Sequence, residues 1–292
     1  MRTINGRIKF DILRSIGPAL ALLVTVLSGC QPPDITVQAH PTASGKNPRA
    51  KIVFLAGPDS HLPGAHEHKA GSELLSDALR RRDATIETIN VYGGWPADES
   101  LFDGVDAIVM YCDGGKSHLV NDHLQTFNRL LAEGVGILAL HYCVEVPKGS
   151  PSAESMLNAI GGYFETWWSV NPTWTANYTE LPQHPITRGV KPFILKDEWY
   201  FNMRFVDQGV TPILSAIAPP STIKRWNGAH SGNDAVRQLV ADELPQVTTW
   251  AYERPDGSRG FGYTGGHYHA NWENADARAL VLNAIEWVAI RP

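Results

Sequence analysis

Histidine is concentrated in a few short segments of this sequence. It is the side chain that titrates nearest neutral pH and the commonest nitrogen ligand of metal ions. The first such segment, DSHLPGAHEH at residues 59–68, carries three imidazoles and two carboxylates. We expect His61 and His66 to bind substrate, and His68 to lie further into the following helix. The alternative is a solvated loop in which Glu67 complements the dipole of that helix.

The second segment, His141-Tyr142-Cys143, ends the apolar run GILALH at 136–141. A side chain at such a strand-to-helix turn projects into the central crevice of an α/β protein. We therefore predict that His141 is catalytic. A nucleophilic Cys143 needs a partner base and a lowered pKa, and this reading is kept as an alternative.

The third segment is an acidic pair beside aromatic rings, Asp197-Glu198-Trp199-Tyr200. Glu198 is a candidate general acid or base, and Trp199 and Tyr200 offer faces that can stack on sugar rings. Because neighbouring side chains of a strand point to opposite faces, Asp197 and Glu198 are not expected to act as a pair. The alternative is an exposed turn beside core aromatics.

The fourth segment, GGHYHANW at 265–272, places His267 and His269 at alternate positions, so that they share one face if the chain is extended. The two imidazoles are then expected to meet His141. These three residues form a predicted ligand set for a divalent cation such as zinc, with His267 also a catalytic candidate. Asn271 is predicted to bind substrate.

The elements around these segments alternate between strand and helix. Short apolar runs predict buried strands, and apolar residues at helical spacing predict amphipathic helices. The expected strands are 51–56, 85–91, 107–111, 136–141, 246–252 and 260–264, and the expected helices are 66–82, 119–133 and 276–288. This order indicates an α/β fold with a mostly parallel sheet, whose ligands bind beyond the carboxyl ends of the strands. Residues 145–245 are expected to form an elaborated insertion with some short strands, covering one end of the sheet.

The N-terminal part of the chain predicts export. Residues 1–30 combine a basic start, an apolar stretch too short to span a bilayer comfortably, and Leu27-Ser28-Gly29-Cys30, which resembles a bacterial lipobox. Cys30 is then the lipidated residue of a membrane-anchored lipoprotein on the periplasmic or cell-surface face. Residues 31–49 are predicted to be a flexible tether, followed by one domain over 50–292. Ordinary secretion with a free Cys30 is the alternative.

Composition limits the classes of partner. The chain of 292 residues has a net charge of -5, which leaves no basic surplus for nucleic-acid phosphates.

In an oxidising compartment Cys112 and Cys143 are able to pair. A disulfide and two separate buried thiols are both compatible with the sequence.

Six motifs together resemble the trehalose-utilisation (ThuA-like) family: SHLPGAHEH, HYCVEVPKG, GGYFETWWSVNPTW, HPITRGV, DEWYF and GGHYHANW. The resemblance covers about residues 50–290 and implies a flavodoxin-like three-layer sandwich similar to class I glutamine amidotransferases, with a role in sugar metabolism. In that fold a catalytic Cys ends a central strand, where this chain has His141. The resemblance therefore disfavours glutaminase chemistry, unless Cys143 acts from a shifted position.

The leading functional hypothesis is an exported, lipid-anchored enzyme that hydrolyses, eliminates or isomerises a keto-sugar or glycoside. A base such as His or Glu and an electrophile, for example a bound metal ion, suffice for this chemistry. The second hypothesis is a carbohydrate-binding module without chemistry, which captures glycans through exposed tryptophans. The candidates for that role are Trp167, Trp168, Trp174 and Trp199.

Overall fold

The computed structural model describes residues 34–42 and 48–290. The predicted signal segment, including Cys30, lies outside these residues. Within them, no helix has the length and apolar character needed to cross a bilayer.

An eight-stranded sheet organises the described chain, in the order β1-β3-β2-β4-β5-β12-β11-β10. The five strands from β3 to β12 run parallel, and β1, β11 and β10 add antiparallel pairs at the two sides. The strands are β1 (Thr36–His40), β2 (Ala50–Ala56), β3 (Ile86–Tyr92), β4 (Ala107–Tyr111), β5 (Gly136–Leu140), β10 (Val210–Ile217), β11 (Pro245–Glu253) and β12 (Arg259–Tyr263). The prediction of a mostly parallel α/β sheet is confirmed.

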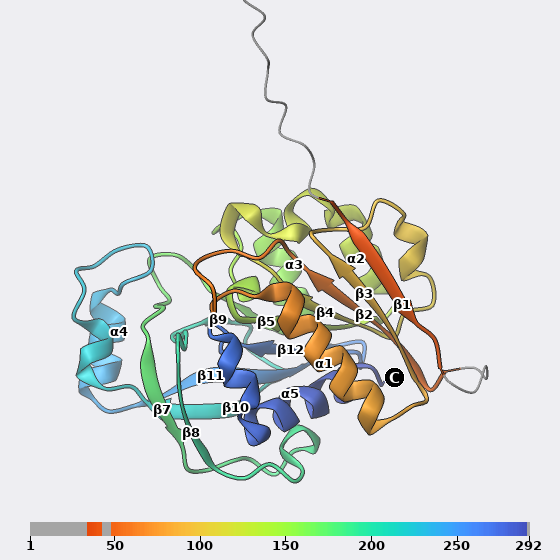
Figure 1. The fold of residues 1–292 in the computed structure, drawn as a ribbon. Helices are drawn as coiled ribbons and strands as arrows, with labels where there is room; N and C mark the ends of the chain where they lie inside the picture. Colours follow the sequence, from red (N-terminus) through yellow and green to blue (C-terminus); the bar gives the residue numbers. More distant parts are fainter. Residues whose placement is uncertain (1–33, 43–47, 291–292) are drawn as a thin grey trace, which may run out of the picture. The chain divides into compact units, whose positions relative to one another are not determined.

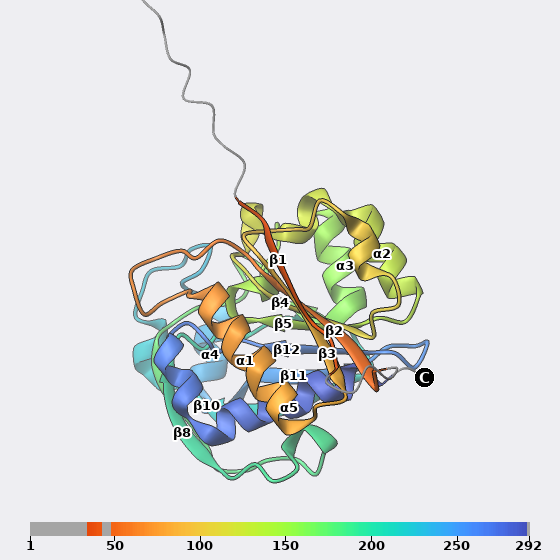
Figure 2. The same ribbon diagram turned by 45° about the vertical axis from the view of Figure 1, so that its right-hand side comes forward.

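Helices cover both faces of this sheet, as Figures 1 and 2 show: α1 and α5 lie on one face and α2 and α3 on the other. Successive residues of a strand alternate between the two cores: Ile52 packs with the α1 and α5 side, and Val53 with the α2 and α3 side. Strands buried on both faces read as unbroken apolar runs, which is why the sequence reveals them. The helices are α1 (His68–Arg82), α2 (Leu124–Ala132), α3 (Pro151–Ile160), α4 (Asp234–Ala241) and α5 (Ala275–Val288).

Short elements complete the fold. Two antiparallel pairs, β6 with β9 and β7 with β8, lie in the middle part of the chain. Figure 1 shows β7, β8 and α4 beside the β10 end of the sheet. The strands are β6 (Gly162–Tyr163), β7 (Trp174–Tyr178), β8 (Phe193–Asp197) and β9 (Arg204–Phe205), and the 3₁₀ helices are η1 (Glu99–Phe102), η2 (Gly115–Ser117), η3 (Leu119–Asp122), η4 (His141–Val144), η5 (Pro185–Thr187), η6 (Pro220–Ile223) and η7 (His269–Glu273).

Three sequence predictions need correction. Residues 36–40 were expected to belong to a flexible tether, but they form β1, which pairs antiparallel with β3 along its whole length. The helix predicted over 119–133 is divided into η3 and α2 at His123. The middle segment also does more than cover the sheet, because it contributes the edge strand β10 and the helix α3.

Candidate functional site

Four side chains from distant parts of the chain converge beyond the carboxyl ends of the strands. His66 follows β2, His141 follows β5, His267 follows β12, and Glu198 follows β8. β2, β4, β5 and β12 are consecutive in the sheet, so the parallel order brings three of these segments together. We call His66, His141, Glu198 and His267 the imidazole cluster.

The facing atoms of the imidazole cluster are close to one another. His66 Nε2 lies 3.0 Å from His141 Nε2 and 3.1 Å from His267 Nδ1, and the last two atoms are 3.2 Å apart. Glu198 Oε2 is more distant, at 3.6 Å from His141 Nε2 and 3.4 Å from His267 Nδ1. A tetrahedral zinc ion with nitrogen and oxygen ligands at about 2.0–2.2 Å would separate its ligand atoms by about 3.3–3.6 Å. The spacing is therefore close to that of a cation site.

The outer nitrogens of two rings fix how these rings face inward. His141 Nδ1 lies 2.9 Å from the carbonyl oxygen of Thr264, which can only accept, so Nδ1 carries the hydrogen. His66 Nδ1 lies 2.9 Å from the Asp113 carboxylate, which also accepts a hydrogen bond from Ser60. When both rings are neutral, each presents the lone pair of Nε2 to the other. Metal-binding histidines are oriented in this way by a carboxylate or a carbonyl on the far nitrogen.

Burial favours the neutral form of His141. His141 is fully buried, and its pKa is held well below 6.5 by burial and by the neighbouring imidazole of His66. The pKa of Asp113 is raised by burial, but hydrogen bonds from His66 and Ser60 outweigh this effect and hold it below the usual value. Without a proton, two lone pairs 3.0 Å apart repel each other, and a cation between them would remove that repulsion.

The cluster opens to solvent on one side. The side chains of Glu198 and His267 remain 19% and 15% exposed, whereas His66 and His141 are buried. The Tyr200 hydroxyl lies 3.3 Å from both His141 Nε2 and Glu198 Oε2. Burial and the nearby Glu198 raise the pKa of Tyr200 well above 10, so its hydroxyl remains a hydrogen-bond donor.

The backbone conformation at the site is strained. His61, His66 and His141 have φ values of 67°, 49° and 54°, in the left-handed region that residues with a Cβ rarely adopt. Such strain is often found at functional sites, where the surrounding structure maintains it. His61 is exposed and its ring lies 3.7 Å from that of His66, so it borders the cluster.

Asp197 positions the loop that carries His267. It is fully buried, and its carboxylate accepts hydrogen bonds from the backbone nitrogens of Gly266 at 2.7 Å, Glu198 at 2.8 Å and His267 at 3.1 Å. Asp197 therefore contacts backbone nitrogens, whereas Glu198 faces the imidazoles, so the two carboxylates do not form a pair. Neither Asp197 nor Asp113 was predicted as a site residue, although Asp197 ends β8 and Asp113 comes shortly after β4.

Several predicted site residues lie elsewhere. His269 begins η7, and its Nδ1 faces Glu67 at 3.6 Å. The prediction that His269 joins His141 and His267 as a cation ligand therefore needs correction. The alternation that would have put it beside His267 is lost where the extended chain turns into the 3₁₀ helix. Trp199 is fully buried in the core and is not able to stack on a substrate. Asn271 donates to the carbonyl oxygen of Lys196 and is not part of the imidazole cluster.

Cys112 and Cys143 are buried free thiols with their sulfur atoms 3.5 Å apart. Burial and the adjacent Cys112 raise the pKa of Cys143 well above 9. A buried thiol with a raised pKa is a poor nucleophile, which argues against the alternative based on Cys143.

Of the tryptophans proposed for glycan capture, Trp174 is buried like Trp199, and Trp167 is 61% exposed.

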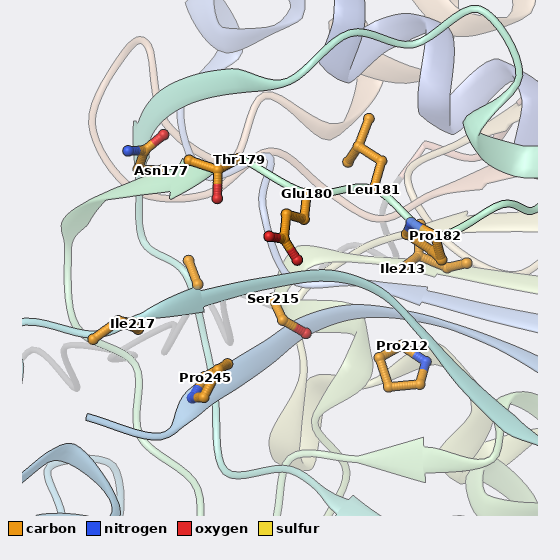
Figure 3. Close-up of a pocket in the computed structure, with 11 residues that line it drawn as sticks. Asn177, Thr179, Glu180, Leu181, Pro182, Pro212, Ile213, Ser215, Ile217 and Pro245 are labelled. Atoms are coloured by element: carbon orange, nitrogen blue, oxygen red, sulfur yellow. The ribbon is translucent and has the colours of Figure 1, made fainter. Parts of the chain in front are cut away.

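A separate pocket lies at the β10 edge of the sheet. It has a volume of about 850 Å³ and is lined by β10 and by the chain that follows β7, as Figure 3 shows. Glu180 and Ser215 are among its polar residues. None of its lining residues belongs to the imidazole cluster.

Comparisons with known proteins agree with this architecture. A family model described as trehalose utilisation (ThuA) matches residues 61–288. A ThuA-like protein from Bacteroides uniformis shares 17% sequence identity at a TM-score of 0.55, covering 85% of this chain and 95% of that one. A second, from Parabacteroides merdae, shares 14% identity at a TM-score of 0.52, with 82% and 90% covered. At these identities the structural similarity concerns the fold alone.

A glutamine amidotransferase from Thermotoga maritima is also found, with 9% identity, a TM-score of 0.41, and 82% and 98% of the two chains covered. No match was found among curated protein sequences. The family model covers most of the chain, including all four residues of the imidazole cluster. The chain therefore belongs to the ThuA family, whose kind of function is carbohydrate utilisation.

Proposed function

We propose that His66, His141 and His267 hold a divalent cation such as zinc, and that the protein uses it to process a carbohydrate. The observation that carries this proposal is the pair of Nε2 atoms of His66 and His141, which face each other at 3.0 Å while both outer nitrogens are hydrogen-bonded to oxygen atoms. Three imidazoles and an open fourth position are the usual ligand arrangement of a catalytic zinc ion.

Glu198 is the base in this proposal. It is the most exposed member of the cluster, and its carboxylate is further from the imidazoles than they are from one another. It therefore faces the position that water or substrate would take. A bound cation polarises a carbonyl group or lowers the pKa of a water molecule. Glu198 would then accept a proton from that water or from the carbon beside the carbonyl.

The substrate class that suits this arrangement is a keto-sugar or a glycoside, processed by hydrolysis, elimination or isomerisation. Each of these reactions needs a base and an electrophile, and none needs a thiol. The small-molecule carbohydrate agrees in kind with the trehalose-utilisation family. His61 borders the cluster and would contact the sugar. Tyr200 is buried like Trp199, so its ring does not stack on a sugar, and only its hydroxyl borders the cluster.

The test is an assay of 3-keto-glucosides with purified protein. We expect turnover by the zinc-loaded wild type, loss of turnover after chelation, and loss in the Glu198→Gln variant although its metal is retained. The Asp207→Asn variant, which changes an exposed carboxylate away from the cluster, serves as the control. Equal turnover by wild type and His141→Ala would overturn the proposal.

We also propose export and anchoring through lipidated Cys30. The lipobox-like LSGC sequence at 27–30 and the apolar stretch before it support this. The Cys30→Ala variant should lose its lipid and move from the membrane fraction to the soluble fraction. An unchanged membrane fraction in this variant would contradict the proposed anchor.

A carbohydrate-binding module without chemistry is the second candidate. The side chains that favour it are Trp167 and Trp226, which are 61% and 93% exposed on the middle segment. Exposed tryptophan faces are suited to stacking on sugar rings. Calorimetry distinguishes the two: sugar binding that is unaffected by His267→Ala, with no product after long incubation, would favour the binding module.

A further inference from the structure

A second histidine and carboxylate pair lies beside the imidazole cluster. His230 Nε2 is 2.9 Å and 3.1 Å from the two carboxylate oxygens of Glu145. The Glu145 side chain is 5% exposed, whereas that of His230 is 37% exposed. A buried carboxylate thus holds an imidazole that is partly exposed to solvent.

The His230 ring is fixed in orientation. It stacks on Phe164 with ring centres 5.3 Å apart and an angle of 24° between the planes. Since Nε2 donates to Glu145, Nδ1 is the nitrogen left to act on another molecule. Among the described residues, none forms a hydrogen bond with this Nδ1. A ring held by a carboxylate on one nitrogen and free on the other is the arrangement of a general acid or base.

Contacts link this pair to the imidazole cluster. The Asn171 backbone nitrogen donates to the carbonyl oxygen of His230 at 3.2 Å, and the Asn171 side chain donates to Glu198 at 3.4 Å. Phe164, which stacks on His230, also packs against Tyr200 with ring centres 5.3 Å apart. Two separate routes of one or two residues therefore connect His230 with Glu198.

The charged groups that act on His230 favour its protonated form. The hydrogen bond to Glu145 raises the pKa of His230, and the charges of Glu145 and Glu198 act in the same direction. Burial and the nearby Arg225 lower it, but the raising effects are larger. At neutral pH this imidazole therefore carries a proton more often than a free histidine does.

The loop that carries His230 is also held by contacts that do not involve this side chain. The Trp167 backbone nitrogen donates to the Ala229 carbonyl at 2.8 Å, and Asn233 donates to the Trp168 carbonyl at 2.8 Å. Arg225 also donates to the carbonyl oxygen of His230 at 3.0 Å. None of these contacts uses the side chain of residue 230, so we expect them to be kept in variants at this position.

We infer that His230, oriented by Glu145, is the general acid of this site, acting opposite the base Glu198. The inference rests on the proposed function. In the cleavage of a glycoside by elimination, Glu198 takes the proton beside the carbonyl, the glycosidic C–O bond breaks, and His230 gives its proton to the departing oxygen. The products are an unsaturated keto-sugar and an alcohol, and transfer of a proton from Glu198 to His230 through solvent restores both groups.

The experiment compares His230→Asn and Glu145→Gln with wild type on the same 3-keto-glucoside. His123→Asn is the matched control, since His123 is also 37% exposed and faces a carboxylate, that of Glu99 at 3.5 Å. We expect His230→Asn to lower kcat about 100-fold or more, with KM changed less than threefold and metal content unchanged. Activity that requires protonated His230 falls as pH rises through its pKa, so Glu145→Gln should move this fall to lower pH. A kcat of His230→Asn within threefold of wild type would overturn the role of His230. If the wild type is active in the same assay, the proposed function is still supported.

A second measurement does not depend on turnover. The ring carbon signals of His230 are followed by NMR in the zinc-loaded protein, with pH and with added 3-keto-glucoside. We expect a pKa above 6.5 that decreases in Glu145→Gln, and a change of the His230 signal when the sugar binds. An inactive wild type contradicts the proposed function. A His230 signal that the sugar does not change overturns the role of His230, whether or not the wild type is active.

Discussion

At the scale of single residues, the partners on the outer nitrogens determine what the imidazole cluster can bind. A carbonyl on His141 and a carboxylate on His66 leave both Nε2 atoms as acceptors facing each other. Sequence spacing singled out His66, His141, Glu198 and His267, but not which of them share one centre. It placed His269 among the ligands because it could not show where the extended chain turns into η7.

Asp113 is predicted to strengthen metal binding through His66. Its carboxylate accepts the hydrogen bond from His66 Nδ1 and so increases the basicity of Nε2. The Asp113→Asn variant should bind zinc about 10–100-fold more weakly, as measured by competition with a chromogenic chelator. Asp207→Asn should leave the affinity unchanged, and an equal affinity of Asp113→Asn and wild type would refute the orienting role.

The left-handed backbone at His141 predicts an unusual order of stability. Both His141→Gly and His141→Ala remove the imidazole, but only glycine adopts a φ of 54° without steric cost. In chemical denaturation the glycine variant should exceed the alanine variant by about 1 kcal/mol in free energy of unfolding. At Glu73, inside α1, the order should be reversed, with alanine the more stable by about 0.5–1 kcal/mol. A more stable alanine variant at both positions would show that position 141 is not strained.

At the scale of elements, the strands of the parallel sheet were predictable because they are buried on both faces. The apolar runs at 51–56, 107–111 and 136–141 mark β2, β4 and β5 to within a residue. Signals for α3 are also in the sequence, since Ser150 caps its N-terminus, Pro151 is its first residue and Gly161 ends it. By contrast, β1 was not predictable because its residues are mostly exposed and gain their order from pairing with β3.

The contacts of Glu165 join the strand pair β6–β9 to the chain before α3. Its carboxylate accepts hydrogen bonds from Tyr163 and Arg204 and pairs with Lys148 at 2.9 Å. Burial raises its pKa, but hydrogen bonds from Arg204 and Lys148 outweigh this and lower it from 4.5 to about 2. A carboxylate with a lowered pKa stabilises the folded state above its unfolded pKa, and this contribution is lost as pH falls toward the folded value.

We therefore expect Glu165→Gln to be less stable than wild type at pH 7, by about 1–3 kcal/mol. The difference should shrink between about pH 4.5 and pH 2, where the wild-type carboxylate takes up a proton. Urea unfolding of metal-free protein across this range measures it. Glu133→Gln, an exposed pair with Arg129, should differ little from wild type at any pH. A difference for Glu165→Gln that is independent of pH would contradict this assignment.

At the scale of the whole molecule, the cluster unites residues up to 201 positions apart in the sequence. Such a site exists only in the folded chain, because the parallel sheet alone brings the ends of β2, β5 and β12 together. The sequence predicted this edge as the location of the chemistry. From the middle segment it predicted Glu198, but it did not predict Asn171 and His230, which are linked to Glu198 through irregular chain.

The metal content of the purified protein tests the central claim most directly. After incubation with zinc and dialysis, elemental analysis should find about one zinc ion per chain in wild type and in His269→Ala, and almost none in His66→Ala or His141→Ala. Circular dichroism of each variant verifies that it is folded. A wild type that retains no zinc, or a His269→Ala variant that loses as much zinc as His141→Ala, would contradict the account.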